Sequence, residues 1–99
     1  MKAYVIVDIE VTDQPAYENY RKLAPATIAA YGGTYLARGG ATTVLEGDWQ
    51  PRRLVILEFP SAERASEWWH SPEYAEPKRL RQLSTRTNMV MIEGTSPVF

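Results

Sequence analysis

The sequence predicts an α+β domain in which two helices cover one face of a four-stranded antiparallel sheet. Strand-like and helix-like segments follow one another in the order strand, helix, strand, strand, helix, strand. Two strand-like segments, Lys2–Val11 and Arg53–Phe59, each have one wholly apolar side, which indicates a sheet with one face against a core. Both helical segments begin at a residue that commonly caps helices, Asp13 or Ser61.

The first strand is predicted over residues 2–11. One of its sides is apolar (Val5, Val7, Ile9), and the other begins apolar and ends in carboxylates (Tyr4, Ile6, Asp8, Glu10). The helix that follows starts at Asp13, with Pro15 in its first turn, and stops at Gly32-Gly33. Pro25 lies inside this helix and is expected to kink or split it, because proline removes a backbone donor.

The second strand is predicted as Thr34–Arg38, and Gly39-Gly40 interrupts it as a bulge or a turn. Strand character resumes over Thr43–Glu46, and a loop with one large aromatic residue, Trp49, follows. The third strand spans about residues 52–59 and ends before Pro60. Its two sides are again apolar (Val55, Leu57, Phe59) and mixed (Leu54, Ile56, Glu58).

The second helix is predicted to begin at Ser61, with Ala62, Ala65 and Trp69 on its inner stripe and Trp68 to one side. The run Ser71-Pro72-Glu73 indicates a bend or a new helix start. The last strand is predicted over Thr87–Glu93, and residues 94–99 form a tail. We therefore expect a single domain over residues 1–99.

This order of elements is the split βαβ pattern of the ferredoxin-like βαββαβ sandwich. We expect an antiparallel sheet of strand order 4-1-3-2 with both helices on its apolar face. The right-handed crossover rule is taken to make the first and third strands parallel at the centre of the sheet. That register would place Tyr4 near Leu54 and Asp8 near Glu58 on the face opposite the helices.

Composition and charge exclude several classes of function. Eleven Lys and Arg balance twelve Asp and Glu to a net charge of −1, so neither a nucleic-acid footprint nor a polybasic membrane anchor is present. The absence of cysteine excludes disulfides and thiolate chemistry. No apolar segment is long enough to span a bilayer, and the N-terminus lacks a signal-peptide pattern. We expect a cytoplasmic protein without a membrane or nucleic-acid partner.

Three charged residues are the first candidates for a site. Asp8 and Glu58, side by side in the expected register, would repel each other unless one stays protonated or a cation such as Arg38 lies between them. They would then act as acid, base or orienting groups for a small ligand. The alternative is a set of strand-end salt bridges that fix the register or an interface, with little energy in each.

Aromatic residues and the lone histidine are the next candidates. His70, at a helix end, is a candidate base or an exposed helix-end residue. The large aromatic residues near the helix break would pack in the core and at its edge, or form an aromatic wall for a flat apolar ligand or a partner chain (Trp68, Trp69, Tyr74). Trp49 is the residue we expect at a subunit contact. The basic residues of the following helical segment are typical of a solvated helix face (Lys78, Arg79, Arg81, Arg86).

Four motifs in order resemble the bacterial family named domain of unknown function 1330: MKAYVIVDIEVTD, YGG-YLARGG, LEGDW-P-RLVILEFPS and W-SPEY. The similarity covers Met1 to about Gly94. It implies a ferredoxin-like subunit of the dimeric α/β-barrel superfamily, in which two sheets meet through their open faces. That superfamily includes cofactor-free oxygenases, haem enzymes, isomerases and binding modules, so the fold does not select a function.

Two hypotheses remain open from the residues, and the resemblance adds a third. The protein is either a homodimer that binds a small organic or aromatic ligand between sheet and helices, with proton transfer or cofactor-independent oxidation as its chemistry, or a non-catalytic homodimeric module. The resemblance alone adds a haem enzyme, for which His70 inherits no support. We expect neither a metal nor a cofactor.

Overall fold

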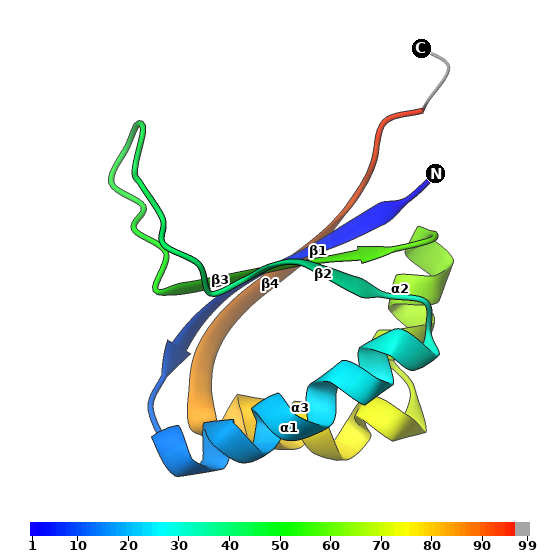
Figure 1. Cartoon of the computed structure of the whole chain (residues 1–99), viewed down its shortest axis with the longest axis horizontal. Helices are drawn as coiled ribbons and strands as arrows, with labels where there is room; N and C mark the ends of the chain where they lie inside the picture. Colours follow the sequence, from blue (N-terminus) through cyan, green and yellow to red (C-terminus); the bar gives the residue numbers. More distant parts are fainter. Residues whose placement is uncertain (97–99) are drawn as a thin grey trace.

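The structure is a computed structural model, and it describes residues 1–96. Three helices and four strands follow one another as β1 (Ala3–Val11), α1 (Gln14–Ala30), β2 (Thr34–Arg38), β3 (Arg53–Phe59), α2 (Ala62–Trp69), α3 (Pro72–Ser84) and β4 (Thr85–Glu93). The sheet forms one layer and the helices form a second layer on one of its faces (Figure 1). The restart predicted at Ser71 is therefore a separate helix, and the last strand begins two residues earlier than expected.

The strand order β2-β3-β1-β4 confirms the predicted order 4-1-3-2, read from the other edge. All neighbouring strands are antiparallel, so the expected parallel pairing of β1 with β3 is wrong. The crossover through α1 makes β2 parallel to β1, and the turn between β2 and β3 then reverses the chain. The third strand must therefore run against the first.

The core lies between the helices and the apolar side of the sheet. The helix-facing residues of β1 and β3 are buried, as the alternation predicted (Val5, Val7, Ile9, Val55, Leu57, Phe59). Aromatic and apolar residues of the helices pack against them (Tyr17, Tyr20, Ala24, Ile28, Ala65, Trp68, Tyr74). Burial of these side chains supplies the main driving force for folding.

Helix α1 runs continuously through Pro25, where a kink or a break was predicted. Proline at this position leaves the carbonyl of Arg21 without its usual backbone donor four residues later. The guanidinium of Arg38, on the neighbouring strand β2, donates a hydrogen bond to that carbonyl at 3.2 Å. A side chain thus replaces the missing backbone donor, and the helix continues. The predicted cap is present, because Asp13 accepts a hydrogen bond from the backbone N–H of Ala16.

Residues 39–52 form an irregular arm that projects from the sheet on the side away from the helices (Figure 1). The strand predicted over Thr43–Glu46 is therefore wrong, since none of the strands in the described part of the chain pairs with these residues. Of the predicted tail, Gly94 extends the ladder by donating to the carbonyl of Lys2, and residues 97–99 lie outside the described part of the chain.

Candidate functional site

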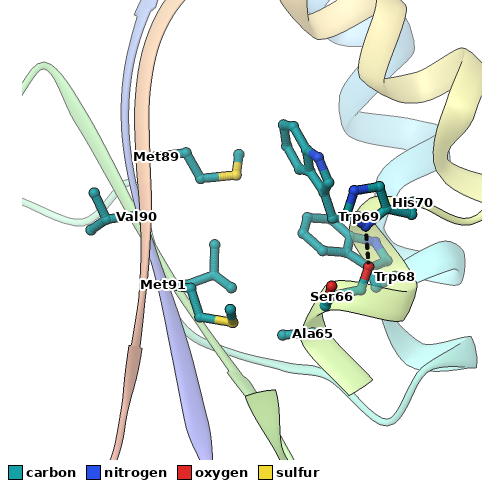
Figure 2. A pocket seen from close by; sticks show the side chains of 9 residues that line it. Ala65, Ser66, Trp68, Trp69, His70, Met89, Val90 and Met91 are labelled. Carbon is teal, nitrogen blue, oxygen red and sulfur yellow. Dashed lines mark hydrogen bonds between the residues drawn. The ribbon is translucent and has the colours of Figure 1, made fainter. Parts of the chain in front are cut away.

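A pocket of about 220 Å³ opens between helix α2 and the edge strand β4. Figure 2 shows the side chains around it. The lining residues come from β1, from α2 and its C-terminal end, and from β4 (Val5, Ala65, Ser66, Trp68, Trp69, His70, Met89, Val90, Met91). Most are apolar, and the polar groups of Ser66 and His70 lie together at the end of α2. The pocket is therefore suited to a small molecule that is mostly apolar.

The pocket exists because β4 extends beyond the cover that the helices provide. Met89 and Met91 follow the alternation of the strand and face the helix side, opposite Val7 and Val5 of β1. Val5 is 4% exposed, whereas Met91 is 48% exposed. In Figure 2 both methionines point toward the tryptophans and His70, and Val90 points away. Flexible thioether side chains suit a surface that adapts to a ligand.

The two adjacent tryptophans have exchanged the positions that the sequence predicted. Trp68 is buried in the core and packs against Tyr74 at 4.1 Å between ring centroids, with the ring planes inclined by 33°, and its indole N–H donates to Thr27. Trp69 is partly exposed and forms part of the pocket wall. The ammonium of Lys78 lies 4.4 Å from the Trp69 ring centroid. Of the residues predicted for an aromatic wall, Trp69 places a partly exposed ring at the pocket, and Tyr74 does not.

Tyr74 is fully buried and does not line the pocket. Its hydroxyl lies 3.0 Å from that of Tyr20 and accepts a hydrogen bond from Nε of Arg81 at 3.2 Å. Burial raises the pKa of Tyr20 well above its ordinary value, and the neighbouring Tyr74 adds to the shift. The Tyr20 hydroxyl therefore remains uncharged at neutral pH. This pair is a buried polar network behind the pocket.

His70 ends helix α2, and its ring lies at the pocket. Nδ1 is 3.0 Å from the carbonyl oxygen of Ser66. A carbonyl oxygen only accepts, so Nδ1 carries a hydrogen in this contact, and the neutral ring then has Nε2 as its acceptor. The ring is thus held in one orientation with one nitrogen free to accept a proton. Of the predicted site residues, the structure brings His70 and Trp69 together here.

The structure separates the three charged candidates. In the antiparallel register Asp8 lies opposite Leu54, and Glu58 lies opposite Tyr4. Four residues of strand, about 13 Å, therefore separate the two carboxylates along the sheet. The predicted pairing of Asp8 with Glu58 is wrong because it assumed parallel strands. Arg38 reaches the backbone of α1, on the opposite face of the sheet, and is not the cation between them.

Each carboxylate has another partner. Asp8 accepts one hydrogen bond from the indole N–H of Trp49 and one from the backbone N–H of Arg52, both at 2.9 Å. Glu58 forms a salt bridge with Lys2 at 3.0 Å, and the hydrogen bond in that pair raises the pKa of Lys2. Asp8 therefore attaches the arm to the sheet. Trp49, which was expected at a subunit contact, therefore has a partner in its own chain.

Sequence reasoning missed Met89, Met91 and Ser66 as pocket residues. The alternation of residues 87–93 contained a signal, since it places both methionines on one side of the strand. The expectation was only that both helices lie on the apolar face of the sheet, and no side of this strand was assigned to it. Within residues 1–96, no group of three or more His, Asp or Glu residues gathers to hold a metal ion. No helix in the same range is long and apolar enough to cross a membrane.

Comparison with known proteins places the chain in a family. Residues 2–95 match the model of the family described as "Domain of unknown function (DUF1330)". The chain belongs to the DUF1330 family. None of the curated proteins matches this DUF1330 chain in sequence.

Solved structures with the same fold belong to proteins with different descriptions. A protein of unknown function from Rhodopseudomonas palustris has a TM-score of 0.78 at 18% identity, covering 97% of this chain and 84% of that one. A dimeric ferredoxin-like protein of unknown function from Jannaschia has a TM-score of 0.66 at 13% identity, covering 95% and 100%. SnoaB, a cofactor-independent oxygenase from Streptomyces nogalater, has a TM-score of 0.64 at 9% identity, covering 98% and 96%. These likenesses establish the ferredoxin-like fold of this DUF1330 member.

Proposed function

We propose that this protein is a homodimer that binds a small, flat, largely apolar organic molecule in the pocket between α2 and β4. The observation that carries the proposal is the partly exposed surface made by Trp69, Met89 and Met91 on the helix side of the sheet. Most other apolar side chains on that side are buried in the core. A concave apolar surface with a few polar groups at one end is the usual form of a small-molecule site.

The pocket is large enough for an aromatic ring system. An apolar cavity of about 150 Å³ accommodates benzene, and this pocket measures about 220 Å³. The indole of Trp69 offers a flat surface for stacking, and methionine sulfur makes favourable contacts with aromatic rings. These features support an aromatic ligand of one or two rings.

His70 is the group in this pocket that can exchange a proton with a ligand. Its Nδ1 hydrogen is engaged by the Ser66 carbonyl, which leaves Nε2 as a base at the end of an otherwise apolar pocket. A general base needs hydrogen-bond reach to the proton that it removes. If the protein is an enzyme, we propose that His70 performs this step. The Asp8 and Glu58 carboxylates already have partners on the opposite face.

The test uses the methionine methyl groups as probes. The chain has three methionines, of which Met89 and Met91 line the pocket and Met1 is an internal control at the N-terminus. We expect a naphthalene or indole derivative to shift the ¹³C-methyl NMR signals of Met89 and Met91 and leave that of Met1 in place. Trp69→Ala should abolish the shifts. Unchanged methyl signals across a panel of mono- and bicyclic aromatics would show that the pocket is not a ligand site.

A separate surface supports the homodimer. Apart from the arm at Asp8, no segment within residues 1–96 covers the sheet face opposite the helices (Figure 1). On this face Val90 and Ile92 are 60% and 57% exposed, and they lie opposite Ile6 and Tyr4 of β1. Apolar patches of this kind usually mark interaction sites. The polar end of the face carries charges of both signs, with Glu10 paired to Arg52 and Arg86.

A second copy of this chain is the occupant that we propose for this face. The face has an apolar part and a polar part that carries charges of both signs, so it is complementary to a second copy of itself. A two-fold symmetric interface requires this self-complementarity. The arm with Trp49 projects on the same side of the sheet, so it is placed to contact a copy seated there (Figure 1). The dimeric neighbour from Jannaschia is consistent with this arrangement.

Sedimentation velocity at micromolar concentration tests the dimer. Ile56 lies at the centre of the open face, opposite Ile6, and Ile56→Lys should convert the dimer to a monomer. The matched control is Leu83→Lys, because Leu83 is an exposed apolar residue on α3, on the helix side of the molecule. We expect Trp49→Ala to weaken the dimer less. A wild type that sediments as a monomer, or an intact Ile56→Lys dimer, would contradict the proposed interface.

A further inference from the structure

A second pocket of about 410 Å³ adjoins the first and shares Trp69 and Met89 with it. Its remaining lining residues are polar and come from the end of α3 and the start of β4 (Arg81, Gln82, Thr85, Thr87). The two pockets together form a trough along β4. Its lining is apolar near Met91 and polar near Thr85. The charged residue at the polar end is Arg81.

Among residues 1–96, Arg81 is a buried cation without a counter-ion. It is 3% exposed, and within the described residues it takes part in no salt bridge. Its Nε donates to the hydroxyl of Tyr74 at 3.2 Å, and its two Nη atoms make no hydrogen bond within that part of the chain. A buried charge is normally paired, because its removal from water costs several kcal/mol.

The surroundings of Arg81 hold its charge in place but do not neutralise it. Arg81 lies in the last turn of α3, where the carbonyl end of the helix favours a cation. Its guanidinium carbon is 5.7 Å from the ring centroid of Trp69. Tyr20 and Tyr74, the polar groups behind it, are phenols, and burial keeps the Tyr20 hydroxyl uncharged by raising its pKa. The remaining donors are the two Nη groups at a pocket wall.

We propose that Arg81 binds the carboxylate of the ligand, so that the trough takes an aromatic or other flat apolar carboxylic acid. The two Nη groups present a pair of donors, which matches the two oxygens of a carboxylate. The apolar part of such a ligand lies against Trp69, Met89 and Met91 in the adjoining pocket. The inference rests on the proposed ligand-binding function and adds the chemical class of the ligand.

This placement also assigns separate tasks to the residues at the ends of α2 and α3. Arg81 neutralises the acid group at the polar end of the trough, and Trp69 stacks on the ring between the pockets. His70 lines the first pocket and not the second. Its free Nε2 therefore faces the part of the ligand away from the carboxylate.

The test compares 2-naphthoate with 2-naphthamide, which have nearly the same shape and differ in charge. Titrations are followed by the ¹³C-methyl signals of Met89 and Met91 in the full-length protein. A paired charge-assisted hydrogen bond predicts that the wild type binds the carboxylate at least about tenfold more tightly than the amide. Arg81→Gln should reduce this ratio to near one and leave amide affinity within about threefold of the wild type.

Lys78→Gln is the matched control, because Lys78 is a second cation against Trp69 but lines neither pocket. This variant should keep the preference for the carboxylate. Equal wild-type affinities for the two probes would overturn the role of Arg81 while leaving the ligand pocket intact. Methyl signals that respond to neither probe would overturn the proposed function as well. If Arg81→Gln fails to fold, the ratio of carboxylate to amide affinity can still be measured in the wild type and in Lys78→Gln. These two ratios then test the role of Arg81.

Discussion

Gly33 offers the sharpest test of how tightly the core behind the pocket is packed. It lies between α1 and β2 and is buried. A Cβ added there would lie 2.6 Å from Cγ2 of Ile28 and 2.7 Å from Cε1 of Phe59. Carbon atoms in ordinary contact are about 3.5–4.0 Å apart, so each contact is about 1 Å too short. Neither neighbour has free space, because Ile28 and Phe59 are both in the core.

Gly33→Ala should therefore destabilise the fold by overpacking. Such changes cost about 1–3 kcal/mol, which for a chain of this size lowers Tm by roughly 4–24 °C. The change should also reach the pocket, because Phe59 contacts Trp68 at 5.4 Å between ring centroids and Trp68 lines the pocket. We expect the methyl signals of Met89 and Met91 to move in the unliganded variant.

Gly40→Ala is the matched control for this experiment. A Cβ at Gly40 meets no atom within 4 Å, and its backbone is not in the left-handed region. The loss of a glycine restricts the unfolded chain, so this variant should be as stable as the wild type or more stable by up to about 1 kcal/mol. Both variants are compared by urea and thermal unfolding at one protein concentration, because dimerisation makes stability depend on concentration. Equal stabilities for the two variants would refute the packing argument.

Two further predictions concern buried polar groups in the core. Thr27→Val leaves the buried indole N–H of Trp68 without its acceptor and should cost about 1–3 kcal/mol in urea unfolding; an unchanged midpoint would mean that the indole finds another partner. The pKa of Tyr20 is raised in the folded state above its ordinary value of 10.0. Its contribution to stability is therefore complete below pH 10.0 and is lost as the pH rises through the pKa of the folded state. The free energy of unfolding of Tyr20→Phe should therefore fall less steeply than that of the wild type above pH 10; parallel curves would contradict this.

The alternation of apolar residues was enough to predict both faces of the sheet. Local patterns account for the buried positions of β1 and β3 and for the caps at Asp13 and Ser61. The strand order follows from general rules of chain connection. The direction of β3 relative to β1 was mistaken, and that one error placed Asp8 beside Glu58. Strand direction depends on how connections cross the sheet, and the side-chain pattern of a strand is nearly the same read either way.

Errors in the helices have a different cause. Trp68 and Trp69 are neighbours in sequence and lie about 100° apart around a helix, so a small rotation of α2 decides which one is buried. Pro25 was expected to disturb α1, and a side chain from β2 supplies the missing donor. Arg81 was assigned to a solvated basic face, but its side chain is buried against Tyr74 and Trp69. Each outcome depends on contacts between segments that are distant in sequence.

The sequence by itself determined the order of the elements and the buried side of β1 and β3 in this DUF1330 member, because periodicity and caps are local properties of each segment. It also identified Trp69 and His70 as candidates. Only the tertiary structure decided that Met89, Met91 and Arg81 join them along one trough. The physical reason is that β4 extends past the cover of the helices, and a gap between elements depends on their relative placement. No pattern within a single strand or helix records that placement.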